Sequence, residues 1–461
     1  ALPICFSNFY NCAKCTPSRG SLLTGRYPHR AGVGSAIAMP DKNYKKGAYQ
    51  GYLEPSIPNI ANFFRENGYQ TGMSGKWHLG EREQHWPMNY GFDSYYGLIS
   101  GASSYFEKVK EKRNRRFVQD STEFTPPSKD WYFTDEIADH AIEHITRFSQ
   151  AGQPFVEYVA FTAPHWPLHA LDKDIQKYAG KYDQGWAATR QARHQKLQGL
   201  GVLENVPELP LAPETIPAWD ERDTTQAWAR RMEVHAAMVD NMDQNIGRLL
   251  AALEKLGQLD NTIVLFLSDN GASAEDIIGR QLHNPDIPVG QQGSFLSFCE
   301  PWANVSNVPF YNYKLRLYEG GIASPLIVHY PKSLADKIAP QAEKVYHDPV
   351  HIMDIFPTMI DWTVGLTATD RVTLGLDGSS INQLVSTDQE RPLFWEYRKS
   401  AAFRQGDYKL VRNMGAAWEL YHVKNDRSER ENLATQELER LRAMIEAWEA
   451  WALEVGVFEE R

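Results

Sequence analysis

Two short apolar runs, each followed at once by polar residues, place the strongest constraint on how this chain can fold. Residues 155–161 read Phe-Val-Glu-Tyr-Val-Ala-Phe and lead into a loop with His165, and residues 262–267 read Thr-Ile-Val-Leu-Phe-Leu and lead into Asp269 and Asn270. Runs of this kind are typical of buried parallel strands. Because the functional groups of open α/β sheets lie on loops at the carboxyl ends of strands, we expect these polar residues to line a site.

The rest of the pattern indicates an α/β fold with two parts. A chain of 461 residues can hold one large domain and a smaller one. Apolar residues recur at helical spacing over about 225–256, whereas short strand-like runs follow residue 385. We predict a large central mixed, mostly parallel sheet flanked by helices over 1–385. A small α+β subdomain, an antiparallel sheet plus a helix, is predicted over 386–461.

Composition excludes several classes of protein. The net charge of −10 argues against a nucleic-acid partner, which would need a basic face. No apolar run reaches the roughly 20 residues that span a bilayer, so we expect no membrane insertion. Four cysteines in this length do not make a disulfide scaffold.

Residues 15–26, Cys-Thr-Pro-Ser-Arg-Gly-Ser-Leu-Leu-Thr-Gly-Arg, have the pattern of a nucleophile at the start of a helix. Pro17 suits the first helical turn and Gly25 suits the helix end. Unpaired N–H groups and the helix dipole would favour an anion at Cys15, and Arg19 lies one turn along. Cys12 and Cys15 also form a Cys-x-x-Cys motif, which leaves open a redox pair, half a zinc site or a structural disulfide.

This twelve-residue segment resembles the signature of the sulfatase family, in its formylglycine-dependent, arylsulfatase-like branch of the alkaline phosphatase superfamily. The resemblance implies that a formylglycine-generating enzyme oxidises Cys15 to an aldehyde. It also implies that the aldehyde hydrate attacks the sulfur of a sulfate ester. The expected function is therefore hydrolysis of aryl or carbohydrate sulfates.

Three later segments resemble the same family. Residues 75–80 read Gly-Lys-Trp-His-Leu-Gly, His165 follows the first apolar run, and Lys314 precedes a Glu-Gly-Gly turn. From the residues alone, the Lys and His of the first segment are better explained as a surface lysine beside a helix-capping histidine. The resemblance implies that these groups bind the formylglycine hydroxyl and the sulfate oxygens, and that His165 or a neighbour protonates the leaving oxygen. The expected catalytic residues are Cys15, Arg19, Lys76, His78, His165 and Lys314.

Asp269 and Asn270 offer the oxygen ligands of a hard cation at the end of a strand, although Asp-Asn-Gly is also a common tight turn. The resemblance favours a metal site, with Cys15, Asp269 and Asn270 as ligands and Ca²⁺ preferred to Mg²⁺. It further implies a strand with an Asp pair before residue 1. We therefore expect the given sequence to be truncated at its N-terminus and to lack that first strand.

The substrate is the least constrained part of the prediction. A basic run could be a solvated face or could line the approach for an anionic sugar; it comprises Lys108, Lys110, Lys112, Arg113, Arg115 and Arg116. Candidate wall residues are Arg113, Arg115, Trp77, Trp166 and Tyr313, and His169 is either a substrate contact or an ordinary loop residue. We expect a periplasmic or secreted enzyme acting on a small-molecule or glycan sulfate ester. The alternatives are a phosphate or phosphonate ester hydrolase of the same superfamily and a non-catalytic homologue.

Overall fold

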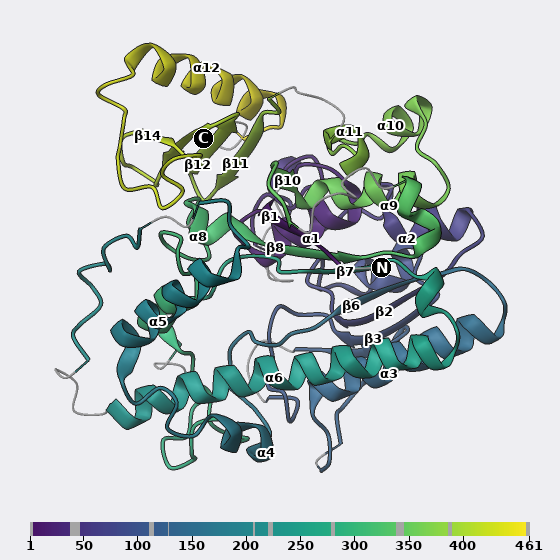
Figure 1. The fold of residues 1–461 in the computed structure, drawn as a ribbon. Helices are drawn as coiled ribbons and strands as arrows, with labels where there is room; N and C mark the ends of the chain where they lie inside the picture. Colours follow the sequence, from purple (N-terminus) through teal and green to yellow (C-terminus); the bar gives the residue numbers. More distant parts are fainter. Residues whose placement is uncertain are drawn as a thin grey trace.

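A computed structural model describes most of the chain, and its strands form three sheets (Figure 1). The described residues are 3–36, 47–109, 115–127, 129–205, 208–219, 225–277, 282–337, 345–385 and 390–457. Two of the sheets have five strands each and are mixed. Within each of them, two strand pairs are parallel and two are antiparallel. The predicted α/β class is confirmed. Half of the strand pairings in these two sheets are parallel, whereas a mostly parallel sheet was expected.

The first sheet is built around β1 (Ile4–Tyr10), the strand that leads to Cys15. It pairs in parallel with β10 (Val350–His351) and β9 (Val345–Tyr346), and antiparallel with β8 (Ala323–His329). β7 (Val264–Leu267) pairs antiparallel with β8 and ends the sheet.

In the second sheet, β2 (Gln70–Lys76) lies between two parallel neighbours. These are β3 (Ser94–Leu98) and β6 (Phe155–Ala160). The antiparallel strands β4 (Phe117–Gln119) and β5 (Thr122–Phe124) extend the other side of β3.

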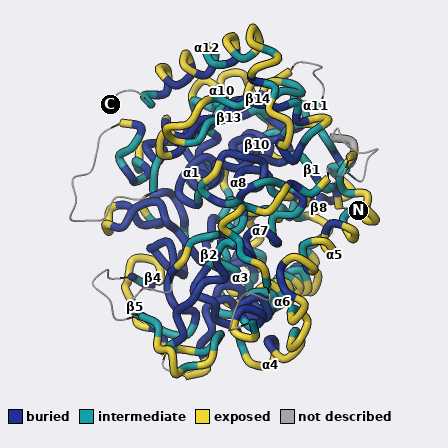
Figure 2. The backbone as a smooth tube through the Cα atoms, turned by 90° about the vertical axis from the view of Figure 1, so that its left-hand side faces the viewer, coloured by how far each residue is buried: buried dark blue, intermediate teal, exposed yellow. Residues whose placement is uncertain are grey.

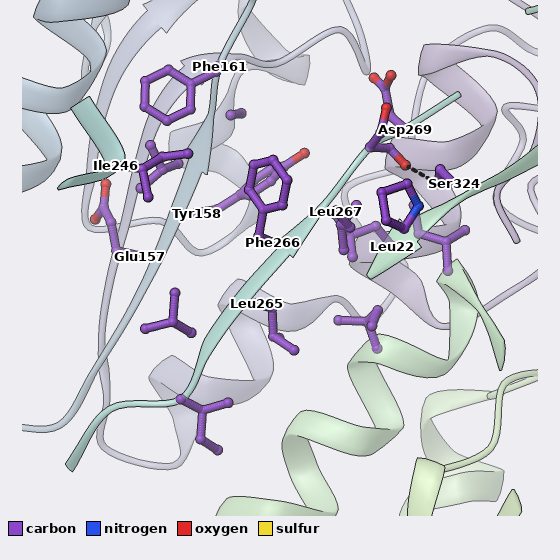
Figure 3. A pocket seen from close by; sticks show the side chains of 18 of the residues that line it. Leu22, Glu157, Tyr158, Phe161, Ile246, Leu265, Phe266, Leu267, Asp269 and Ser324 are labelled. Carbon is purple, nitrogen blue, oxygen red and sulfur yellow. Dashed lines mark hydrogen bonds between the residues drawn. The ribbon is translucent and has the colours of Figure 1, made fainter. Parts of the chain in front are cut away.

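The expectation that residues 262–267 form a central parallel strand was wrong for the described part of the chain. β7 pairs with β8 alone there, and β6 ends the second sheet. Both strands line a cavity of about 1220 Å³, where Figure 3 shows the side chains of Tyr158, Leu265 and Phe266. Phe266 is consequently 38% exposed, because no described strand covers it on that side.

Helices cover both faces of the two sheets (Figure 1). α3 (Phe133–Gln150) packs on β2 and β6, and the long α6 (Thr225–Lys255) packs on α3. On the other side lie α1 (Cys15–Thr24), α2 (Ile60–Glu66) and α9 (Ile355–Thr363). The helix predicted over about 225–256 is therefore confirmed.

Other local features complete the architecture. Asn59 caps α2, because its side chain accepts the N–H groups of Ala61 and Asn62. Residues 31–34, which follow α1, are buried. Three further helices are α4 (Asp172–Ile175), α5 (Gly185–Leu200) and α7 (Cys299–Ser306).

The C-terminal region forms the predicted antiparallel sheet and helix. Its strands are β11 (Leu393–Tyr397), β12 (Ser400–Gln405), β13 (Tyr408–Arg412) and β14 (Glu419–His422), followed by α12 (Leu438–Glu454). The turn at Gly406 and Asp407 joins β12 to β13. One hydrophobic cluster includes Tyr10 and Tyr318 together with this region, which therefore packs firmly on the first sheet.

Burial is concentrated where the nucleophile helix lies (Figure 2). All ten residues of α1 are buried, whereas α12 exposes one side to solvent. A helix that is buried on every side is held by packing from all directions, so its first residue is fixed in place. None of the helices in the described ranges is long and apolar enough to cross a membrane.

Candidate active site

Cys15 is the first residue of α1 and is buried. Gly25 ends the helix with φ of +66°, a left-handed conformation that glycine adopts readily, and its N–H donates to the Ser21 carbonyl at 2.9 Å. The predicted helix and its end are confirmed. The Cys15 side chain therefore sits where the free N–H groups of the first turn favour an anion.

Cys12 serves the fold instead of forming a reactive pair with Cys15. All four cysteines are free thiols, so a Cys12–Cys15 disulfide is contradicted. The Cys12 sulfur lies 3.5 Å from the Ser21 hydroxyl, and burial raises its pKa to about 12, which argues against a reactive thiolate. Among the described residues no three His, Cys, Asp or Glu side chains gather closely enough to hold a metal ion.

Four groups from three separate segments surround the Cys15 sulfur. Lys76 ends β2 and His78 follows it, His165 lies beyond β6, and Lys314 lies on the loop before α8 (Glu319–Ile322). All but His165 are almost fully buried as residues. His78 and His165 lie beside Cys15, and Lys76 and Lys314 act on it by charge.

The pKa of the Cys15 thiol reflects the charged and polar groups that surround its sulfur. Burial raises the pKa of the thiol, but the charges of Lys314 and Lys76, together with the neighbouring His165 and His78 rings, outweigh burial. The pKa is therefore held well below its usual value. The sulfur stands where the nucleophilic oxygen of an oxidised side chain would lie, so the same field would stabilise an oxyanion there.

Lys314 and His165 form a hydrogen-bonded pair with a defined proton arrangement. Lys314 Nζ lies 3.0 Å from His165 Nε2, and His165 Nδ1 lies 2.8 Å from the Trp166 carbonyl. Burial, followed by the charge of Lys314, lowers the pKa of His165 to about 4. The ring is thus neutral near pH 7, donates from Nδ1 to the carbonyl and accepts from Lys314 at Nε2. Lys314 itself stays charged, because Cys15 and Glu275 outweigh the effect of burial and raise its pKa.

Asp269 and Asn270 follow β7 and lie on the other side of the site. Arg19 Nε donates to Asp269 Oδ2 at 3.2 Å, and Arg19 Nη1 donates to the Lys76 carbonyl at 2.5 Å. Asn270 donates from Nδ2 to the Gly271 carbonyl, but its buried Oδ1 has no hydrogen-bond partner among the residues that the structure describes. A buried amide oxygen without a donor fits a hard cation, so the residue types agree with the metal that the sulfatase resemblance implies.

The structure does not support most of the expected substrate-wall residues. Trp77 has 0% exposure and donates to the His85 carbonyl, so it belongs to the core. Arg115 is buried and donates to the Ala102 carbonyl. Arg113, like Lys110 and Lys112, lies outside the described residues. Trp166 lies beside His165 as expected, whereas the Tyr313 hydroxyl donates to Glu300.

His169 is a structural residue. Its Nδ1 accepts the Tyr105 N–H at 3.3 Å, and its Nε2 bonds the Ser294 carbonyl. Burial lowers the pKa of His169 to about 4, so the neutral ring connects two loops at the rim of the site. Of the two readings open from the sequence, these contacts fit the ordinary loop residue.

Sequence reasoning missed two charged residues at the site, Lys14 and Glu275. Glu275 lies between Lys14, Trp166 and Lys314 and contacts all three. Lys14 could have been suspected because it precedes Cys15. Glu275 gave no local signal, since its partner Lys14 lies 261 residues earlier in the chain.

Comparison with known proteins agrees with this geometry. The profile of the sulfatase family matches residues 3–366. An uncharacterized sulfatase of Schizosaccharomyces pombe is 31% identical, over 98% of this chain and 87% of the relative. The arylsulfatase of Klebsiella aerogenes is 30% identical, over 77% of this chain and 78% of the relative. The chain belongs to the sulfatase family, whose members are sulfuric ester hydrolases.

Solved structures share the fold at lower identity. Ps i-CgsB has a TM-score of 0.72 and 24% identity, covering 98% of this chain and 85% of that one. BT4656, solved with its substrate D-glucosamine-2-N,6-O-disulfate, has a TM-score of 0.64 and 20% identity, covering 99% and 91%. The phosphonate monoester hydrolase SpPMH from Silicibacter pomeroyi has a TM-score of 0.54 and 16% identity, covering 98% and 88%. At these identities the likeness concerns the fold.

Proposed function

We propose that residue 15 acts as a formylglycine and hydrolyses sulfate esters, with Arg19, Lys76, His78, His165 and Lys314 as the residues that bind and activate the ester. The observation that carries this proposal is the gathering of Lys76 and Lys314, with His78 and His165, around the buried Cys15 at the start of α1. A field that favours negative charge at a buried point suits an oxygen nucleophile and the charge that develops on a sulfate. A formylglycine-generating enzyme is the partner that would supply the oxidised side chain.

The reaction begins with the hydrated aldehyde at residue 15. One of its two hydroxyl groups first loses its proton to solvent, and the resulting oxyanion forms a bond to the ester sulfur while the bond from sulfur to the leaving oxygen breaks. Lys76 and Lys314 balance the charge that grows on the sulfate oxygens, as their positive charges do for the Cys15 thiolate.

The leaving oxygen requires a proton, and Lys314 is the neighbour of His165 that we assign to this step. The neutral His165 accepts from Lys314 at Nε2 and cannot donate from that atom. In the second step the remaining hydroxyl of residue 15 gives its proton to Lys314, which is neutral after the first step, and forms the aldehyde carbonyl. The bond from the residue 15 carbon to the sulfate oxygen breaks, and the sulfate leaves. A serine or a cysteine has no such second hydroxyl and would stay sulfated.

A divalent cation would be held by Asp269, by the free Oδ1 of Asn270 and by residue 15. When bound, it would polarise the sulfate oxygens. We propose Ca²⁺ in preference to Mg²⁺, because all of these donors are oxygens and Ca²⁺ takes 6–8 of them in flexible geometry. The sulfatase resemblance implies further ligands from an Asp pair on a preceding strand. The cavity between β6 and β7, with Asp269 among its lining residues, is where we propose such a strand to lie.

For the substrate we propose a glycan or small-molecule sulfate ester, met in the periplasm or outside the cell. BT4656 was solved with a sulfated glucosamine as its substrate, and this supports a sulfated sugar here by fold likeness. The similarity to SpPMH keeps a phosphate or phosphonate ester as the second candidate, since both groups are tetrahedral oxyanions.

The test compares p-nitrophenyl sulfate with p-nitrophenyl phosphate and an aryl phosphonate, using protein produced together with a formylglycine-generating enzyme and Ca²⁺. We expect kcat/KM for the sulfate to exceed that for the other two, and Cys15→Ala to abolish turnover of all three. Faster turnover of the phosphate or phosphonate would favour the second candidate. No turnover of any ester would favour a non-catalytic homologue.

A further inference from the structure

Glu275 is the one carboxylate that contacts the lysines on the Lys314 side of the described site. It lies five residues beyond Asn270 in the loop after β7. Its Oε2 accepts from Lys314 Nζ at 3.2 Å and from Trp166 Nε1 at 2.9 Å, and its Oε1 accepts from Lys14 Nζ at 3.3 Å. The Ser273 hydroxyl donates to the same carboxylate at 2.9 Å. Four donors from four positions therefore meet on one side chain.

These contacts tie together segments that are far apart in the sequence. Lys14 directly precedes the nucleophile, Trp166 directly follows His165, and Lys314 is the proton donor assigned above. The carboxylate is ionised, because Lys314, Lys14 and Trp166 outweigh its partial burial and lower its pKa. Glu275 is 28% exposed at its side chain and does not contact Cys15, so it acts through its neighbours.

We propose that Glu275 is a positioning residue of the sulfatase reaction, which fixes the Lys314 ammonium and the His165 loop against residue 15. This inference rests on the proposed function. Charge-assisted hydrogen bonds of this kind hold a flexible lysine chain in one geometry. Small displacements of a catalytic group lower the rate strongly, because reaction needs atoms close to their productive positions.

Charge balance gives a second reason for a carboxylate at this position. Lys14 and Lys314 both lie within 3.3 Å of Glu275, so their ammonium groups are neighbours. In a site largely removed from water, two like charges repel much more strongly than in solution. Without the carboxylate we expect Lys314 to swing away from Lys14 and from the His165 nitrogen. We then expect a slower chemical step, whereas attraction of the anionic substrate would not be weakened.

The test is the variant Glu275→Gln, which keeps the side-chain shape and an oxygen acceptor for Trp166 but removes the charge. We expect kcat on p-nitrophenyl sulfate to fall about tenfold or more, with KM unchanged or lower. A double-mutant cycle with Lys314→Met then asks through which residue Glu275 acts. In the Lys314→Met background, Glu275→Gln should change kcat less than threefold.

The matched control is Asp276→Asn, which removes the exposed carboxylate of the next residue. This variant should keep kcat within twofold of the unsubstituted enzyme, and melting temperatures of all variants should show that they are folded. Two results would overturn this inference alone: an active enzyme whose Glu275→Gln variant has the same kcat, or a cycle in which the decreases in kcat from Glu275→Gln and Lys314→Met multiply. Inactivity of the unsubstituted, formylglycine-containing enzyme would instead overturn the proposed function, and the inference with it.

Discussion

The active site and the base of the C-terminal sheet each bury a cluster of charged side chains, and the two clusters are paired differently. At the base, Lys409 Nζ lies 3.0 Å from Glu319 and 2.8 Å from Glu429, and Arg427 Nε lies 3.0 Å from Glu319. Two cations thus meet two carboxylates, and Tyr10 adds a hydroxyl donor to Glu319 at 2.9 Å. We call these four charged residues the base cluster.

The active site has more cations than carboxylates. Glu275 is ion-paired with Lys14 and Lys314, and Asp269 is ion-paired with Arg19. Within the described ranges no carboxylate is ion-paired with the fourth cation, Lys76. Burial accordingly lowers the pKa of Lys76 to about 8, whereas the paired Lys409 has a raised pKa because Glu319 and Glu429 outweigh burial. The excess of positive charge leaves the site ready for an anion, and the matched pairing at the base serves the fold.

The largest effect on activity should come from Cys15→Ala, which removes the nucleophile. We expect turnover of aryl sulfate to fall by more than a thousandfold, because the remaining cations cannot supply the attacking oxygen. The melting temperature should change little, since one buried sulfur atom is lost. Residual activity above one per cent in a preparation free of wild-type enzyme would contradict the assignment.

Lys314→Met should separate activity from stability at the active site. We expect kcat to fall about 10²–10³-fold, as for loss of one transition-state donor. Unfolding should occur close to the wild-type temperature, because Glu275 keeps Lys14 and Trp166 as partners. A large loss of stability with unchanged kcat per folded molecule would assign Lys314 to the fold.

Lys409→Met should show the opposite behaviour at the base cluster. It leaves Glu319 and Glu429 buried with one cation fewer, and breaking a buried ion pair in this way costs about 3–5 kcal/mol of unfolding free energy. Chemical denaturation measures this loss, and kcat per folded molecule should stay near that of the wild type. If kcat falls while the free energy of unfolding is unchanged, the base cluster does not serve the fold alone, and the proposed difference between the two clusters is wrong.

A smaller effect concerns pH. The pKa of Lys76 is lowered to about 8, so its charge is present below that pH and is lost as the pH rises through it. We expect kcat/KM for a sulfate ester, which does not titrate there, to fall above pH 8 by up to tenfold per unit. Lys76→Arg keeps its charge at higher pH and should shift this fall upward. The same descending limb in both proteins would assign it to another group.

The sequence predicted the parts of the site that depend on local pattern. The Cys15 helix with its Gly25 end and the position of His165 just beyond β6 follow from short runs of residues. Resemblance to the family supplied Lys76 and Lys314, whose polar side chains alone would fit a surface equally well. The antiparallel C-terminal sheet was readable because its strands alternate and Gly406 marks a turn.

Other features depend on contacts that no local pattern contains. Glu275 meets Lys14 and Lys314 only when the loop after β7 lies against the segments that carry the two lysines. Trp77 was expected at the substrate wall but packs in the core beside Tyr90 and Phe92, because an aromatic residue fits either environment. β7 has the composition of a central strand, yet its side toward β6 borders a cavity. The apolar composition of a strand predicts that its side chains can be buried, but it does not predict which neighbouring strand covers them.

Mass spectrometry of the peptide that contains residue 15 tests the central claim most directly. The protein should be produced together with a formylglycine-generating enzyme, and its sulfatase activity measured on the same sample. Conversion of the thiol to an aldehyde lowers the peptide mass by about 18 Da, whereas the sulfenic, sulfinic and sulfonic acids of cysteine raise it. We predict the lower mass, in a fraction that rises in proportion to activity. Full activity with the Cys15 thiol intact would contradict the account.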